Sequence, residues 1–147
     1  MTTKAAIFAE MDDGTILCTT VNRAGTLTYT GRVLAEHYTA ISKITKLCQM
    51  GYIELVGYEP ELTTKEEELT RTKYTHLVAP SDVFNCQKLP NKFANMDEVE
   101  KYFNTHDIRI HMCYLFTRTG WFFAEYTPNK WRRMTPELIN YDFVEAG

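Results

Sequence analysis

The chain has 147 residues, of which 44% are hydrophobic and 24% are charged, the balance of an ordinary globular domain. A net charge of −3 provides no basic field for nucleic acid, and it is too small for a DNA mimic. The four cysteines lack CxxC or zinc-type spacing, and the sequence shows neither a signal-peptide pattern nor a stretch of transmembrane length. We therefore expect a single domain over residues 1–147, in the cytoplasm, with reduced thiols and no metal or cofactor.

The N-terminal region is predicted to begin with a β-hairpin. Two β-prone runs, 5–11 and 15–21, flank Asp12-Asp13-Gly14. An Asp-Gly pair in this position favours a tight turn in which both central residues have positive φ. With this turn, Ile7 and Ile16 would both point into the core.

A long amphipathic helix is predicted over 31–51, and a third short strand over 27–30 is compatible with the loop before it. Apolar residues recur at steps of three and four and form one stripe, with polar residues mostly between them. The stripe consists of Val33, Leu34, Tyr38, Ile41, Ile44, Leu47 and Cys48. Gly51 suits the left-handed position that ends many helices, so this helix would organise the core.

The middle of the chain alternates between short apolar and polar segments. Residues 52–55 are a short apolar segment, and 74–79 are predicted as a buried strand that ends at a proline. The very polar stretch 59–73 is predicted as a solvated loop, with one exposed helical turn as the alternative. Residues 81–93 are predicted to be irregular because prolines interrupt them.

The C-terminal third contains a second helix and a second hairpin. Asn95 has capping-box spacing to an acidic residue three positions later, which predicts a helix start. The apolar stripe of this helix consists of Met96, Val99, Tyr102 and Phe103. Strands are predicted over 108–117 and 121–126, joined by a turn in which Gly120 takes the left-handed position. A threonine cap and a first-turn proline at 135–137 predict a short helical turn.

The order of these elements predicts the fold class. Hairpins at both ends and two helices between them favour an α+β domain. We expect an antiparallel sheet of about five or six strands, covered on one face by the two helices.

Sequence motifs for catalysis are weak. Only His37 lies in an HxT motif, so a two-histidine phosphoesterase would lack its second motif, and the position of His37 beside the apolar stripe favours a structural role. The cysteines lie in apolar patterns or an ordinary loop, and the glycines form no phosphate-binding motif. We therefore expect a protein that is not an enzyme.

Two basic and aromatic clusters are candidate binding sites. The loop at 22–32 could hold an anion near a helix start and stack a base, although an ordinary surface loop explains the same residues. The segment 130–133 places three cations around an indole, and the final hairpin could join either site. The candidate ligand-binding residues are Asn22, Arg23, Tyr29, Arg32, Arg118, Trp121, Arg132 and Arg133.

Four motifs in order resemble a family of small phage and prophage proteins. That family has a DGTI hairpin, a GxxLxEHYT helix and a late YLFxxGxW hairpin; the corresponding segments here are 13–16, 31–39, 46–53 and 114–121. The direct matches are Glu36, His37, Tyr38, Gly120 and Trp121. Two of the family's loops differ: 21–26 lacks an aromatic-Asp-Gly-Tyr segment, and 79–82 lacks an arginine.

The resemblance extends to the Thoeris anti-defence signal-sponge proteins, which bind cyclic ADP-ribose isomers without hydrolysing them. It implies a phage anti-defence protein that sequesters a nucleotide immune signal, either a cyclic ADP-ribose isomer or a cyclic oligonucleotide. It also implies a homo-oligomer with the pocket between protomers. The net charge and the lack of a stretch of transmembrane length lead us to expect no DNA or membrane partner. The alternative is a phage-encoded inhibitor that binds a host protein through an aromatic surface.

Overall fold

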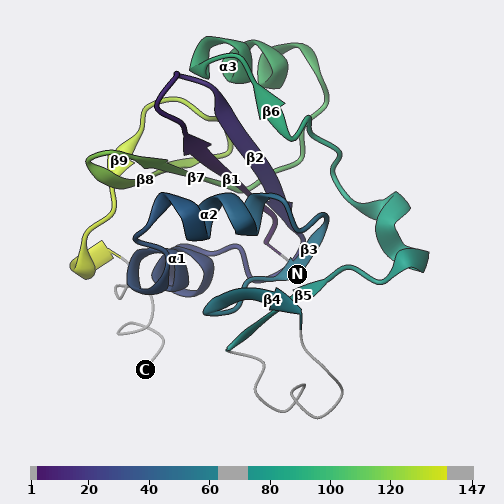
Figure 1. Cartoon of the computed structure of the whole chain (residues 1–147). Coiled ribbons are helices and arrows are strands. Elements are labelled where there is room, and N and C mark those ends of the chain that lie inside the picture. The colour runs from purple at the N-terminus through teal and green to yellow at the C-terminus, as the bar shows by residue number, and fades with distance from the viewer. Residues whose placement is uncertain (1–2, 63–72, 139–147) are drawn as a thin grey trace.

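The computed structural model describes residues 3–62 and 73–138. They form an α+β structure around a mixed sheet with the strand order β4-β5-β3-β2-β1-β7-β8-β9, in which β6 also pairs with β2 (Figure 1). The strands are β1 (Ala5–Glu10), β2 (Ile16–Val21), β3 (Ile53–Leu55), β4 (Glu59–Leu62), β5 (Tyr74–Leu77), β6 (Lys92–Phe93), β7 (Met112–Thr117), β8 (Gly120–Glu125) and β9 (Arg132–Arg133). The helices are η1 (Leu27–Gly31), α1 (Arg32–His37), α2 (Ile41–Cys48), η3 (Pro80–Asn85) and α3 (Met96–Thr105).

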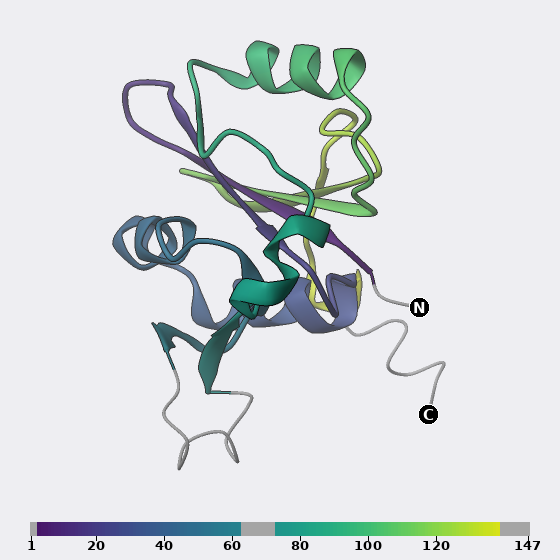
Figure 2. The ribbon, with the colours of Figure 1, turned by 90° about the vertical axis from the view of Figure 1, so that its right-hand side faces the viewer.

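The sheet differs from the predicted one in size, strand direction and cover. Three strand pairs, β1–β7, β2–β3 and β4–β5, are parallel, so the prediction of an antiparallel sheet of five or six strands is wrong. Helices cover both faces: α3 lies on one side of the strands, and α1 and α2 lie on the other (Figure 2). The prediction of one covered face is therefore also wrong.

Burial of β1 explains why both faces need cover. All residues from Ala5 to Ala9 are fully buried, so both faces of this strand contact a core. Ile7 packs in the cluster beneath α1 and α2, whereas Phe8 packs in the cluster beneath α3. A strand that is apolar at every position is typical of a central strand covered on both sides. Ile16 is buried as predicted, on the α3 side.

The two predicted hairpins are present. Strands β1 and β2 pair in antiparallel register, as do β7 and β8. In the first turn Gly14 alone has positive φ, at 89°, so the prediction that both central residues would have it is wrong. The backbone N–H of Gly14 donates to the carbonyl of Met11 at 2.9 Å, which closes the turn with Asp13 in an ordinary conformation. Gly120 has a φ of 117° at the second turn, as predicted.

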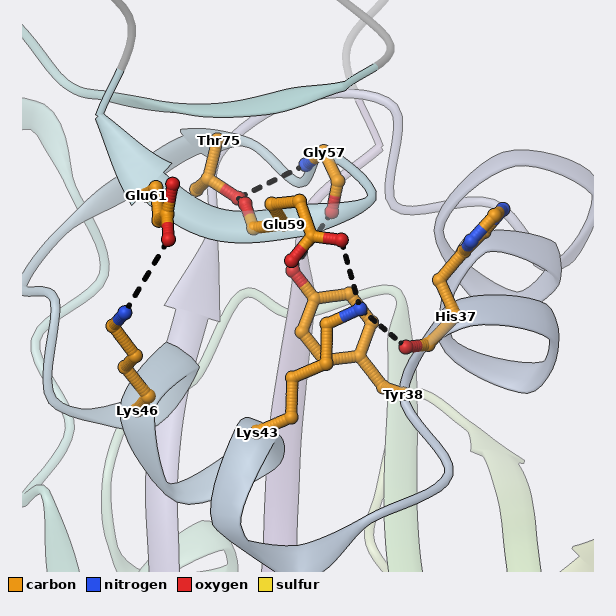
Figure 3. A network of polar contacts seen from close by, with 8 residues as sticks. All are labelled: His37, Tyr38, Lys43, Lys46, Gly57, Glu59, Glu61 and Thr75. Carbon is orange, nitrogen blue, oxygen red and sulfur yellow. Dashed lines mark hydrogen bonds and ion pairs between the residues drawn. The ribbon is translucent and has the colours of Figure 1, made fainter.

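The predicted long helix is two helices, because the backbone turns away from helical geometry between His37 and Ile41. Two side chains, one from β8 and one from α2, satisfy the carbonyls at the break. The Trp121 indole N–H donates to the carbonyl of Tyr38 at 2.8 Å. As Figure 3 shows, the Lys43 ammonium donates to the carbonyl of His37, at 2.7 Å. The break is therefore stable without the i→i−4 hydrogen bonds that a continuous helix would supply.

The break also positions Tyr38 against the neighbouring arm of the sheet. Its hydroxyl donates to the carbonyl of Gly57 at 2.7 Å, and the Thr75 hydroxyl accepts from the Gly57 N–H at 3.1 Å (Figure 3). Lys43 lies 3.5 Å from the Glu59 carboxylate and 4.8 Å from the centre of the Tyr38 ring. The polar groups at this junction thus connect α2 to β4 and β5 instead of lining a site.

The shorter predicted elements agree with the structure in part. Residues 27–30 are part of the π-helix η1 and are not a strand, because the Gly31 N–H donates to the Thr26 carbonyl at 3.2 Å. The predicted loop 59–73 begins with strand β4, and its remainder lies mostly outside the described residues. The Asn95 cap is confirmed: its side chain accepts from the Glu98 N–H at 3.0 Å. At the C-terminal turn, Leu138 N–H donates to the Thr135 hydroxyl at 3.3 Å.

Candidate functional site

The connection between β8 and β9 covers a pair of adjoining cavities. The larger has a volume of about 540 Å³ and is lined by residues that include His111, Phe123, Glu125, Tyr126 and Arg132. The second, of about 370 Å³, shares Phe123, Glu125 and Arg132 with the first. Both volumes are in the range of small-molecule pockets, so the junction at Arg132 is a candidate ligand site.

The backbone of this connection is strained at two positions. Tyr126 has a φ of 67° and Lys130 a φ of 52°. Residues other than glycine rarely adopt positive φ angles. The Tyr126 N–H donates to the His111 carbonyl at 2.9 Å, and this bond holds the first strained residue in place. Strained residues of this kind concentrate at functional sites. Tyr126 as a whole residue is 63% exposed, so a planar ligand group has access to it.

Arg132 is the principal cation at the junction. On β9 it lies opposite Phe123, and its guanidinium carbon is 5.1 Å from the centre of that ring. Arg132 forms no ion pair with another described residue. An arginine supported by an aromatic face retains its hydrogen-bond donors for an anionic ligand. Lys130, which lines the smaller cavity, adds a second cation.

His111 contributes a hydrogen-bond donor to the larger cavity. Its Nδ1 accepts from the backbone N–H of Lys4 at 3.0 Å. A ring nitrogen that accepts carries no proton, so in the neutral imidazole the proton is on Nε2. His111 therefore offers an N–H to a ligand oxygen.

The neighbouring arginine of the predicted basic cluster lies on the opposite face of the sheet. Arg133 pairs with Phe122, its guanidinium donates to the Thr119 carbonyl at 2.6 Å, and its guanidinium carbon lies 4.7 Å from the Phe122 ring centre. Trp131 packs edge-on against Phe8 on that same side, with ring centres 6.4 Å apart. Because successive strand residues point to opposite faces, β9 separates the two arginines.

In the predicted loop site before the first helix, the polar side chains are paired with carboxylates of the protein itself. Asn22 donates to the Glu54 carboxylate at 2.7 Å, and Arg23 lies 3.8 Å from the same carboxylate. Arg32 lies 3.3 Å from Glu36, one helical turn further along. Tyr29 is half-buried against the core, and burial raises the pKa of its hydroxyl. Asn22 and Arg23 thus share one carboxylate, and Arg32 is paired with a different one.

The remaining candidates lie elsewhere. Arg118 is exposed at the tip of the second hairpin, 3.4 Å from Asp12 at the tip of the first. Trp121 is buried and forms the hydrogen bond at the helix break described above. Neither residue lines the two cavities beside Arg132.

Sequence reasoning did not identify His111, Glu125 or Tyr126 as site residues. The segment after β8, Thr127-Pro128-Asn129, is a clear turn signal, and loops between strands are common locations for ligand contacts. That signal indicates where the loop is. It does not indicate that His111, the residue immediately before β7, lies beside this loop.

The His37 ring stacks on Tyr58 with ring centres 3.9 Å apart, which agrees with a structural role. Within residues 3–62 and 73–138, no group of three or more His, Cys, Asp or Glu side chains is arranged to hold a metal ion. In the same ranges, no helix has the length and apolar character needed to cross a membrane.

Three of the four thiols are buried, and we expect these three to react slowly. Burial raises the pKa of Cys48 and of Cys113 to about 12, and it raises the pKa of Cys18 as well. Because thiolates are the reactive form, we expect a disulfide reagent at pH 8 to modify the partly exposed Cys86 at least about tenfold faster than the others. The absorbance of the released thiol measures this, and a Cys86→Ser variant should lose the fast phase. Four equally fast thiols in the native protein would contradict the expectation.

In comparisons with known proteins, no family model, curated protein or solved structure matches this chain. The site and the sequence motifs are therefore the features that bear on function.

Proposed function

We propose that this protein binds and sequesters a nucleotide-type signal molecule without hydrolysing it, in the anti-defence role that its resemblance to phage proteins implies. The candidate ligands are cyclic ADP-ribose isomers and cyclic oligonucleotides. The observation that carries the proposal is Arg132, which forms no ion pair with the other described residues and lies where two cavities of about 540 and 370 Å³ meet.

The groups around Arg132 suit such a ligand. Its guanidinium matches the geometry of a phosphate, and the His111 N–H can donate to a further oxygen. The exposed Tyr126 ring provides a face for base stacking, and the Glu125 carboxylate can accept from an amino group of a base. Together these groups would recognise the negative charge of a phosphate, the ring face of a base and the amino group at the edge of a base.

Binding without hydrolysis is consistent with the state of His111. A general base needs a ring nitrogen with a free lone pair in reach of the nucleophile. In neutral His111 the unprotonated nitrogen, Nδ1, already accepts from Lys4. The imidazole can therefore stabilise negative charge on a ligand but not remove a proton from water.

The proposal is tested by calorimetric titration with a panel of cyclic ADP-ribose isomers and cyclic di- and trinucleotides, followed by denaturation of the complex. Recovery of one intact ligand would support sequestration. Recovery of a cleaved ligand would show an enzyme instead. No heat change for any member of the panel would reject the proposal.

Arg132→Ala is expected to weaken ligand binding about tenfold to a hundredfold, because a charge-assisted hydrogen bond contributes about 1.5–3 kcal/mol. Arg133→Ala is the matched control, since it removes the same side chain from the adjacent residue of β9 on the opposite face. The dissociation constants of both variants are measured by the same titration. An equal loss in both variants, or a loss in Arg133→Ala alone, would place the ligand elsewhere.

The alternative of an inhibitor that binds a host protein through an aromatic surface has less support. The large apolar side chains exposed among the described residues are Ile41, Phe84 and Tyr126, which lie on α2, on η3 and in the β8–β9 connection. A protein-binding surface usually groups such residues into one patch.

A further inference from the structure

Strand β2 has an open edge in the middle of the sheet. On the side away from β1 it pairs with β6 at Ile16 and Leu17, and with β3 at Val21. β6 and β3 therefore lie beside opposite ends of β2, and residues 18–20 between them have no strand partner on that side (Figure 1). A cleft of about 570 Å³ opens at this gap, and residues 18–20 line it.

Two backbone groups of β2 face this cleft. The Cys18 N–H donates to the Asn91 carbonyl at 2.9 Å, on the side away from β1. The Asn22 N–H points to the same edge, where it donates to the Ile53 carbonyl at 2.8 Å. Alternate residues of a strand present their N–H and C=O groups to one edge, so the Thr20 N–H and the Cys18 carbonyl also point there. Among the described residues neither of these two groups has a hydrogen-bond partner.

The spacing of the two groups favours a small flat ligand. A carbonyl and the N–H two residues further along an extended edge can bind a donor and an acceptor that are neighbours on one molecule. An amino group beside an unprotonated ring nitrogen, as on the Watson–Crick edge of adenine, has this arrangement. A peptide strand fits less well, because β6 and β3 occupy the edge on both sides of the gap and leave only three residues for pairing.

Apolar side chains lie on both sides of the open edge. Leu17 and Cys48 belong to the side that α1 and α2 cover, whereas Leu89 packs on the α3 side, and all three line the cleft. A ring held at the edge of β2 would therefore lie between apolar groups, with its polar edge toward the backbone. The exposed amides of Gln49 and Asn91 also line the cleft and can bind the hydroxyl groups of a sugar.

We propose that the gap in the edge of β2 is a binding site for an aminopurine, with adenine as the best fit. The Cys18 carbonyl accepts from the amino group, the Thr20 N–H donates to the adjacent ring nitrogen, and the ring lies between Leu17 and Leu89. The site is formed within one copy of the chain and requires no phosphate on the ligand. It shares no lining residue with the cavities at Arg132, so it does not rest on the proposed function.

Calorimetric titration of the whole chain with adenosine and two analogues tests the edge contacts. N6,N6-dimethyladenosine lacks the amino donor, and 1-deazaadenosine lacks the ring-nitrogen acceptor. We expect each analogue to bind about tenfold more weakly than adenosine, because each leaves one backbone group of β2 unpaired. Failure of adenosine to bind, or equal affinity for all three compounds, would overturn the proposal.

Amide NMR spectra locate the bound nucleoside. Saturation with adenosine should shift the Thr20 amide proton downfield and slow its exchange with solvent, because this N–H gains an acceptor. The Asn22 amide on the same edge is the control, since it already donates to Ile53 and should change little. A Thr20 amide that stays unchanged at saturation would contradict the assignment of the site.

Variants at the cleft mouth separate this site from the one at Arg132. Gln49 is exposed at the end of α2, so Gln49→Trp fills the mouth without altering the core and should weaken adenosine binding at least about tenfold. Ser42→Trp, on α2 outside the cleft, should bind as the wild type does. Arg132→Ala should also keep the adenosine affinity, whatever its effect on phosphate-bearing ligands. Normal binding in Gln49→Trp with a loss in Arg132→Ala would place adenosine at the other site and reject this one.

Discussion

Gly57→Ala is expected to lower the free energy of unfolding by about 3 kcal/mol or more, the largest effect that we predict. A methyl group at this position would overlap the backbone carbonyl of Tyr74 and would lie 2.8 Å from the backbone nitrogen of Thr75. Both neighbours belong to strand β5, so neither can rotate away as a flexible side chain would. The Gly57 N–H and carbonyl also bind Thr75 and Tyr38, and a shift of this segment would break these bonds.

Urea unfolding followed by circular dichroism measures this effect, and the melting temperature should fall by roughly 10 °C. Gly14→Ala is the control, because Gly14 has positive φ but no atom within 4 Å of the added methyl group. We expect it to cost about 1 kcal/mol from backbone strain alone. If both variants lost the same free energy of unfolding, the close contact with β5 would not be the reason that position 57 requires glycine.

Trp121→Phe is expected to cost about 2–4 kcal/mol. The substitution removes the indole N–H that donates to the carbonyl of Tyr38, and a buried acceptor without a donor costs about 1–3 kcal/mol. The smaller ring also leaves unfilled space beside Phe116, with which the indole packs at 5.2 Å between ring centres. The loss of stability should be concentrated at the helix break.

Trp131→Phe is the matched control. This indole is partly buried against Phe8, and its removal changes packing without leaving the helix-break carbonyl unpaired. We expect it to cost about 1 kcal/mol, measured by the same urea titration. Amide hydrogen exchange adds a local test: in Trp121→Phe the amides that follow the break, including Lys43 and Ile44, should exchange faster than in the control. If Trp131→Phe costs as much as Trp121→Phe, the hydrogen bond contributes little.

The elements that the sequence predicted correctly depend on local signals. Gly14 and Gly120 mark turns in which a left-handed residue is required, and Asn95 caps the residues that immediately follow it. These preferences act within three or four residues, so they are readable without knowledge of the rest of the chain. The α+β class followed from the order of such local elements.

The candidate site was predictable only in part. The cluster at 130–133 pointed to Arg132, but nothing in the sequence distinguishes Arg132 from Arg133. Their side chains point to opposite faces of the sheet because they are successive residues of β9. This strand has only two residues, so no hydrophobic pattern reveals it. His111 and Tyr126 become neighbours because β7 and β8 pair in antiparallel register, which brings the start of one strand to the end of the next.

Local signals were therefore sufficient to predict the two hairpins, the capped helix α3, the α+β class and the basic character of the segment around Arg132. The break of the predicted long helix at Tyr38 depends instead on tertiary contacts. The apolar stripe continues through the break, so local periodicity indicates one helix. The Trp121 indole, which lies 83 residues away, donates to the carbonyl of Tyr38, and the Lys43 ammonium donates to the carbonyl of His37. These bonds compensate for the lost helical hydrogen bonds. Contacts so distant in the chain depend on how both faces of β1 are covered, and local preferences do not contain that information.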